Sequence, residues 1–239
     1  MFSLGNVTRN TIAMVLAGGK GERLGQITTN RPKPCVSFGG KYKIIDFVLS
    51  NLFNSGIKKV YVLTQYRAYP LNKHIKEFWS RLIGHGEFFD TISPETNSDS
   101  EEWFKGTADA IYQFLHFVEA TDADYIAIFG GDHIYKMDVS QMIGYHIMNR
   151  ADITVAAIEV SPEDATRFGI FAVDEDFRVT SFAEKPKNPQ RIPERETCFA
   201  SMGNYIFSTR KLIEVLKEGK KKHDDLDFGK HIIPMMLEK

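Results

Sequence analysis

Continuous apolar runs mark the strands expected in the first two thirds of the chain. Thr11–Ala17 is almost wholly apolar and ends at two glycines, which is typical of a strand buried on both faces of a parallel sheet. Tyr125–Phe129 has the same character and also ends at two glycines. Lys58–Gln65 and Ile153–Val160 indicate two further strands.

Helical spacing of apolar residues alternates with these runs. One helix is predicted from Ile45 through Phe53, ending before Gly56, and a second from Thr107 through Val118. A third is expected over Val139–Asn149, whereas residues 84–106 read as a long ordered loop. Strands that alternate with helices predict an α/β fold with a mostly parallel, Rossmann-like sheet flanked by helices.

The rhythm changes after Pro162. Gly169–Val173, Arg178–Phe182 and Phe199–Phe207 are short strand-like segments separated by turn residues, which indicates a β-rich insertion. Helical patterns then return at residues 211–218 and 228–237.

Composition and charge exclude several classes of protein. The 239 residues are 43% hydrophobic and 26% charged, which is ordinary for a globular protein. The formal net charge of -1 provides no general basic field for nonspecific binding of nucleic acid or an anionic membrane. Cys35 and Cys198 have no metal-site spacing, and no apolar run is long enough to span a bilayer, so we expect a soluble cytoplasmic protein.

A glycine loop follows the first predicted strand. Residues 18–24 match neither the P-loop pattern nor the dinucleotide pattern, because Leu24 stands where a third glycine would be needed. Four basic residues between positions 18 and 34 face one acidic residue: Lys20, Arg23, Arg31 and Lys33 against Glu22. Glycines at a strand end let backbone N–H groups approach phosphate oxygens, so we favour a phosphate site over a solvated basic loop.

Two further motifs carry candidate chemistry. Asp132 follows a buried strand, where one carboxylate can hold Mg²⁺ against substrate phosphates, although a turn aspartate that caps the next helix is an equal alternative. Lys185 precedes Pro186 and is a plausible anchor for a phosphomonoester, although exposed lysines at strand ends are common. The Trp103–Phe104 pair fits an aromatic plug beneath a loop better than a base-stacking surface.

Together these segments resemble the sugar-1-phosphate nucleotidyltransferases, and most closely their ADP-glucose pyrophosphorylase branch. The matching motifs run in family order along essentially the whole chain: Leu16–Leu24, Pro32–Pro34, Phe38–Lys41, Ile44–Phe47, Ser50–Asn51, Asn54–Ile57, Thr64–Tyr66, Gly106–Ala110, Gly131–Tyr135, Phe168–Gly169, Glu184–Pro186, Ala200–Gly203 and Asp227–Lys230.

The resemblance implies a role for each matched residue. The glycine loop and Arg23 would cradle the triphosphate of ATP, and the nucleotide-binding residues would include Leu16, Ala17, Gly18, Gly19, Lys20 and Gly21. Gly106 and Thr107 would border the nucleotide, Lys33 would neutralise phosphate charge, and Asp132 would hold Mg²⁺. Around glucose 1-phosphate would lie Glu184, Lys185, Ser201 and Asp227, with Lys185 on the phosphate. Gln65 and Trp103 match positions implicated in passing an activator signal to the active site.

By this resemblance, the chain transfers an adenylyl group from ATP to glucose 1-phosphate, giving ADP-glucose and pyrophosphate for glycogen or starch synthesis. Residues of about 1–160 would form the nucleotide-binding part and residues of about 161–239 the sugar-phosphate part. The family's hexapeptide-repeat β-helix domain and a further metal-binding aspartate find no match in the sequence, and the full-length form would be a homo- or heterotetramer. Two alternatives are a catalytically silent regulatory homologue and, less favoured, a glycosyltransferase, which would normally carry Asp-x-Asp at its metal site.

Overall fold

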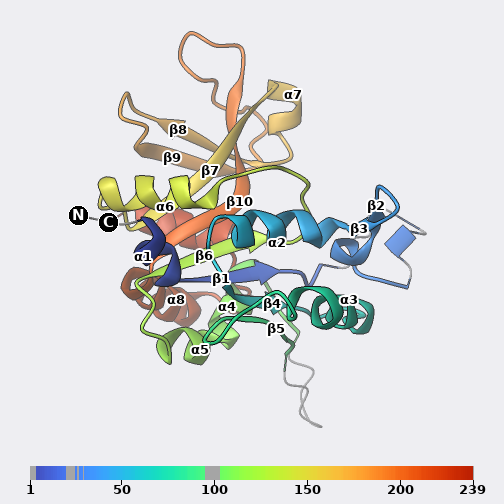
Figure 1. The fold of residues 1–239 in the computed structure, drawn as a ribbon. Coiled ribbons are helices and arrows are strands. Elements are labelled where there is room, and N and C mark those ends of the chain that lie inside the picture. The colour runs from blue at the N-terminus through green and yellow to red at the C-terminus, as the bar shows by residue number, and fades with distance from the viewer. Residues whose placement is uncertain (1–3, 20–24, 26, 29, 95–102, 239) are drawn as a thin grey trace.

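The computed structural model describes residues 4–19, 25, 27–28, 30–94 and 103–238. Its centre is an eight-stranded sheet with the order β5-β4-β1-β6-β10-β8-β9, in which β7 also pairs with β10 (Figure 1). The parallel half consists of β5 (Phe88–Ile92), β4 (Lys59–Leu63), β1 (Thr11–Leu16) and β6 (Tyr125–Gly130). The apolar runs of the sequence therefore form the centre of the sheet, as predicted.

The register of the parallel strands brings their carboxyl ends together. Leu16 at the end of β1 is opposite Leu63 of β4 on one side and Gly130 of β6 on the other. The loops after these three strands consequently leave the sheet side by side. This edge is where open α/β sheets bind ligands.

The second half of the sheet is antiparallel. It is formed by β10 (Cys198–Ser208), β7 (Ile153–Val160), β8 (Gly169–Val173) and β9 (Val179–Glu184). The β-rich segment expected after Pro162 thus continues the central sheet through β10. In Figure 1 these strands, coloured yellow to orange, extend away from the helical layers.

Helices cover both faces of the parallel half. One apolar core lies under α2 (Ile44–Asn54), α6 (Val139–Met148), α3 (Tyr69–His74) and the π-helical segment η3 (Ile75–Trp79). The other lies under α4 (Thr107–Gln113), α5 (Leu115–Glu119) and α8 (Thr209–Lys222). In β1, Ala13 and Val15 face the first core and Ile12 and Met14 the second, as the period of two requires.

Shorter elements complete the described chain. They are α1 (Leu4–Arg9), the 3₁₀ turn η2 (Lys33–Cys35), the hairpin of β2 (Ser37–Phe38) and β3 (Tyr42–Lys43), α7 (Pro162–Ala165), the π-helical segment η4 (Phe228–Ile232) and α9 (Ile233–Leu237). Among the described residues, no helix has both the length and the apolar character needed to cross a membrane. Cys35 and Cys198 are buried and free.

Two sequence predictions were wrong in detail, and one helix was not predicted. The helix predicted from Thr107 through Val118 is two helices, because Phe114 leaves helical geometry at φ -106° and ψ 21°. The stretch between the second strand and Thr107 contains α3, η3 and the edge strand β5, of which β5 lies within the expected loop. A helix, α1, also precedes the first strand.

Candidate active site

The end of β1 and the end of β6 form the first part of the candidate site. The N–H of Gly131 donates to the carbonyl of Leu16 at 2.9 Å, and the N–H of Ala17 donates to the carbonyl of Leu63 at 2.9 Å. A β-carbon added at Gly131 would lie 3.2 Å from the Leu16 oxygen, so the glycine lets the two strand ends approach closely. This packing places Asp132 beside the start of the glycine loop.

Asp132 forms an ion pair with Lys33. Oδ2 of Asp132 lies 2.9 Å from Nζ of Lys33, and Oδ1 lies 3.4 Å from Nε2 of His133. The Asp132 side chain is 38% exposed, so it is accessible from solvent. The pair joins residues 99 positions apart and brings one cation and one carboxylate to the carboxyl edge of the sheet.

The glycine loop is described only in part. Lys20, Gly21 and Arg23 lie outside the described residues. A β-carbon added at Gly18 would lie 3.1 Å from Cβ of Gln65 and 3.4 Å from the Phe104 ring. Around Gly19, by contrast, no atom of the described chain would lie within 4 Å of such a β-carbon, so space is open there.

Gln65 connects the glycine loop to the segment that precedes α4. Its Oε1 accepts a hydrogen bond from the N–H of Phe104 at 3.1 Å. Phe104 packs edge-to-face on Phe114 with ring centroids 5.9 Å apart, and it forms the predicted aromatic plug. Trp103 differs from its neighbour because it is 42% exposed.

The second part of the site surrounds Asp227, which caps η4. Oδ1 of Asp227 accepts from the N–H groups of Gly229 and Lys230 at 2.9 and 3.1 Å. Oδ2 accepts from the hydroxyl of Thr107 at 2.9 Å, and the same hydroxyl accepts from the N–H of Phe228 at 3.1 Å. A residue predicted to border the nucleotide therefore touches a residue predicted to lie near the sugar.

Glu184 lies against the same helix start. A β-carbon added at Gly229 would come within 2.6 Å of Glu184 Oε2 and 3.5 Å of Asp227 Oδ1. Lys185 follows with a positive φ of 47°, which is a strained conformation for a residue with a side chain. Its Nζ lies 3.2 Å from Glu184 Oε1, and the side chain is 55% exposed.

Tyr205 is a member of this group that the sequence reasoning missed. Burial raises the pKa of its phenol to about 12; the Ser201 hydroxyl acts against this shift, and the Asp227 and Glu184 carboxylates act with it. The three predicted sugar-side residues Glu184, Ser201 and Asp227 therefore all influence the pKa of one buried phenol. The available signal was Gly203, a glycine inside a strand, which here has φ 70° at the bulge between Ser201 and Tyr205.

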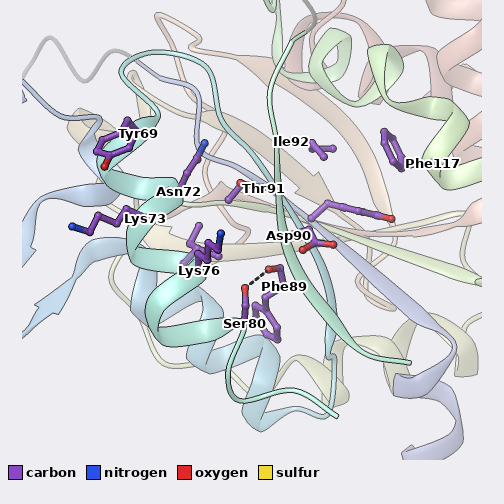
Figure 2. Close-up of a pocket in the computed structure, with 12 residues that line it drawn as sticks. Tyr69, Asn72, Lys73, Lys76, Ser80, Phe89, Asp90, Thr91, Ile92 and Phe117 are labelled. Atoms are coloured by element: carbon purple, nitrogen blue, oxygen red, sulfur yellow. Dashed lines mark hydrogen bonds between the residues drawn. The ribbon is translucent and has the colours of Figure 1, made fainter. Parts of the chain in front are cut away.

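A separate cavity lies along the edge of the sheet. This cavity of about 800 Å³ runs along the edge strand β5, and none of the predicted site residues lines it. Figure 2 shows Lys73 of α3 and Lys76 of η3 on one side of the cavity and Phe117 of α5 on the opposite side. The candidate site residues therefore lie outside this cavity.

The donor groups of the site are compatible with one mode of Mg²⁺ binding. Among the described residues there is no cluster of three or more histidine, cysteine, aspartate or glutamate side chains that would hold a metal. Mg²⁺ commonly uses only one or two protein carboxylates and completes its coordination with substrate phosphates and water. The single, partly exposed carboxylate of Asp132 fits that mode of binding.

Comparison with known proteins gives a consistent family. The chain is 74% identical to a glucose-1-phosphate adenylyltransferase of Geobacter metallireducens and 73% identical to one of Trichlorobacter lovleyi, over all 239 residues in both cases. It is 48% identical over 95% of its length to the enzyme of that name from Thermus thermophilus, of which it covers 56%. The chain spans 58% of each of the first two relatives. Residues 12–239 match the family model described as nucleotidyl transferase, and the chain therefore belongs to the nucleotidyl transferase family.

Proposed function

We propose that this chain carries the nucleotidyltransferase site of an enzyme that converts ATP and glucose 1-phosphate into ADP-glucose and pyrophosphate, for glycogen or starch synthesis. One observation carries the proposal. The hydroxyl of Thr107 donates to Asp227 at 2.9 Å, so the segments expected to bind nucleotide and sugar meet, although they are 120 residues apart. The shared name of the relatives supports this choice of substrates.

On the nucleotide side, the proposed contacts are backbone groups and cations. Gly18 and Gly19 follow β1 at the carboxyl edge, where their N–H groups can donate to phosphate oxygens. Lys33 supplies positive charge beside Asp132. We propose that residues of about 1–160 form this nucleotide part.

On the sugar side, carboxylates face the hydroxyl groups of glucose. Glu184, Asp227 and the Ser201 hydroxyl lie around Tyr205 and can accept or donate hydrogen bonds to a sugar. Lys185 would hold the phosphate as a compact point charge, with its ammonium released from Glu184. Residues of about 161–239 supply most of this part, although Thr107 touches it.

The proposed reaction needs alignment more than a side-chain nucleophile. A phosphate oxygen of glucose 1-phosphate attacks the α-phosphorus of ATP, the new P–O bond forms in line, and the bond to the bridging oxygen breaks to release pyrophosphate. Lys33 and Lys185 hold the two polyanions and reduce their mutual repulsion. Asp132 would hold Mg²⁺, which when bound neutralises charge on the phosphate oxygens.

Further features of the resemblance remain part of the proposal. Gln65 hydrogen-bonds the N–H next to Trp103 and lies against Gly18, so a displacement near Trp103 has a direct route to the glycine loop. We further propose a cytoplasmic protein, which the two free cysteines support, and assembly into a homo- or heterotetramer in full-length form.

The test is a pyrophosphate-release assay with glucose 1-phosphate and each nucleoside triphosphate in turn. ATP should give one pyrophosphate for each ADP-glucose identified by mass spectrometry. Release with another nucleotide and none with ATP would contradict the choice of ATP. Tight binding of both substrates without turnover would instead favour the silent regulatory homologue.

A further inference from the structure

A partly buried ion pair joins α8 to α4, two residues beyond Thr107. Nζ of Lys220, on α8, is 2.7 Å from Oδ1 of Asp109, on α4. The Asp109 side chain is 1% exposed and that of Lys220 is 24% exposed. Burial alone would lower the pKa of Lys220, but the Asp109 and Asp224 carboxylates hold that pKa above its ordinary value, so the residue is charged at neutral pH.

Asp109 fixes the beginning of α4. Its Oδ2 accepts from the N–H of Lys105 at 3.0 Å and from the amide of Gln113 at 3.0 Å. Its own N–H donates to the carbonyl of Leu226 at 2.8 Å. Asp109 therefore binds both the segment before Thr107 and the segment before Asp227.

Lys220 holds the second segment from the other side. Its ammonium donates to the carbonyl of Asp224 at 2.8 Å and lies 3.4 Å from Asp224 Oδ1. Lys105, from the first segment, reaches the other oxygen of the same carboxylate at 2.7 Å. The ammonium of Lys220 is thus shared between the start of α4 and the loop that leads to Asp227.

The two segments are packed too tightly to move independently. A β-carbon added at Gly106 would come within 2.3 Å of the carbonyl oxygen of Leu226 and 2.8 Å of that of Asp225. One residue later, Thr107 is hydrogen-bonded to Asp227 and to the N–H of Phe228. A displacement of the loop at residues 224–227 would therefore move Asp227 and the backbone at Gly106 together.

We infer that Lys220 is a positioning residue, whose bonds to Asp109 and to the carbonyl of Asp224 couple the nucleotide-bordering segment to the sugar-bordering segment. The inference rests on the proposed function. When one substrate orders its own segment, the hydrogen bonds of Lys220 order the second segment as well. Each substrate therefore binds more tightly when the other substrate is already bound. Thermodynamic linkage requires the two enhancements to be equal.

A role in stability alone explains the Lys220–Asp109 ion pair less well than a role in coupling the two segments. Replacement of a buried ion pair by apolar residues of similar size is often neutral or stabilising, so stability does not require charge at this position. A hydrogen-bonded pair does fix distances and directions, because the ammonium must meet each acceptor at a defined angle. Such directional control is what a junction between two subsites needs.

The experiment compares Lys220→Met with Lys222→Met in the full protein. Lys222 lies on the same helix and pairs with Glu218 at 2.9 Å, but its side chain is 56% exposed, so its variant controls for loss of a charge from α8. The affinity for the non-reacting analogue α,β-methylene-ATP, with Mg²⁺, is measured by calorimetry with and without glucose 1-phosphate. The reciprocal titration is measured as well.

We expect glucose 1-phosphate to raise the analogue's affinity at least about fivefold in the unaltered protein and in Lys222→Met, at the lower end of typical coupling. In Lys220→Met the enhancement should fall below about twofold, the same in both titrations. Because Lys220→Met leaves the Asp109 charge buried and unpaired, the double variant Asp109→Asn/Lys220→Met is measured alongside. It removes both charges and should show the same loss of coupling.

Each other outcome overturns the inference. If the folded double variant retains the coupling between the two ligands, that coupling does not depend on Lys220. If Lys222→Met loses the coupling to the same extent, the cause is the loss of any positive charge from α8. If both Lys220 variants fail to fold, the pair serves stability. If the unaltered protein binds both ligands without coupling, the inference fails and the proposed function stands, whereas no binding of either ligand overturns the proposed function itself.

Discussion

Substitution by alanine should have different effects at two glycines of the candidate site: a loss of stability at Gly106 and a loss of ATP affinity at Gly19. At Gly106 a new methyl group would meet three backbone atoms within 2.3 to 2.8 Å. The backbone there is extended, with φ -162°, so conformational preference is not the reason for glycine. The opposing Leu226 carbonyl also accepts from Asp109, which prevents an easy shift of the loop. We therefore expect Gly106→Ala to destabilise the fold.

The magnitude follows from overpacking. Extra atoms in a well-packed region cost about 1–3 kcal/mol. Alanine restricts the unfolded chain and returns about 0.4–1 kcal/mol of stability. The net loss of about 1–2 kcal/mol corresponds to a fall of about 2–8 °C in the thermal midpoint of a chain of this size.

Gly19→Ala should leave the fold intact and weaken nucleotide binding. A β-carbon at Gly19 would meet no heavy atom of the described residues within 4 Å, so we expect no clash with that part of the fold. The same methyl group would occupy space proposed for the triphosphate. Loss of one charge-assisted hydrogen bond of about 1.5–3 kcal/mol would weaken ATP binding roughly tenfold to more than a hundredfold.

Thermal unfolding and calorimetric titration with ATP, in the presence of Mg²⁺, measure both effects on the two variants. The two variants serve as each other's control, because the chemical change is identical. An unchanged thermal midpoint for Gly106→Ala would refute the packing argument. Normal ATP affinity in Gly19→Ala would return that glycine to an ordinary solvent loop.

Three further predictions concern charged and titratable side chains. Lys185→Ala should weaken the binding of glucose 1-phosphate, measured by calorimetry, roughly tenfold to more than a hundredfold while the affinity for ATP changes little. Lys187→Ala is the control. Equal weakening of the binding of both substrates would contradict the assignment. Asp132→Asn should abolish Mg²⁺-dependent turnover with little change in the thermal midpoint. The ion pair of Lys33 and Asp132, whose side chains are 31% and 38% exposed, contributes only about 0–1 kcal/mol to stability. Unchanged turnover would favour the alternative in which Asp132 caps a turn. Burial lowers the pKa of His146 to about 4, against a weaker opposing effect of Asp152, so the unfolded chain takes up a proton first as the pH falls. Stability should therefore drop by up to about 3 kcal/mol between about pH 6.5 and 4, and urea unfolding of His146→Gln should show a flatter pH profile.

The central fold could be predicted because burial leaves a direct trace in the sequence. β1 and β6 lie between two helical layers, so every position is apolar or small, and glycines at their ends mark where the chain leaves the sheet. The edge strand β5 lacks this trace, because Phe88–Ile92 contains Asp90 and Thr91 and has neighbouring strand on one side only. The change from α3 to the π-helical η3 likewise interrupts the regular helical period.

The candidate site could be assembled from the sequence only through its resemblance to a family. Residue types alone suggested a phosphate loop, a carboxylate and a lysine, each with an ordinary alternative. The contact between Thr107 and Asp227 depends on how α4 and η4 meet, and no local pattern records a pairing across 120 residues. Tyr205 was missed for a related reason. Its phenol interacts with the Ser201 hydroxyl of the same strand, β10, but the strand is irregular between these two residues, so the usual alternation of faces does not hold there.

The glycines of the matched motifs have different physical causes, which the structure separates. Gly106 is required by the backbone of the loop before Asp227, and Gly131 allows the close approach of the β1 carbonyl at Leu16. At Gly229 a methyl group would meet the Glu184 carboxylate, which is the end of a flexible side chain. Each of these glycines has a protein neighbour that a methyl group would strike or crowd, so it needs no ligand to explain it. Gly19 has neither such a neighbour among the described residues nor a positive φ. Of these four, Gly19 is therefore the glycine at which a substitution tests the proposed phosphate binding without striking another described residue.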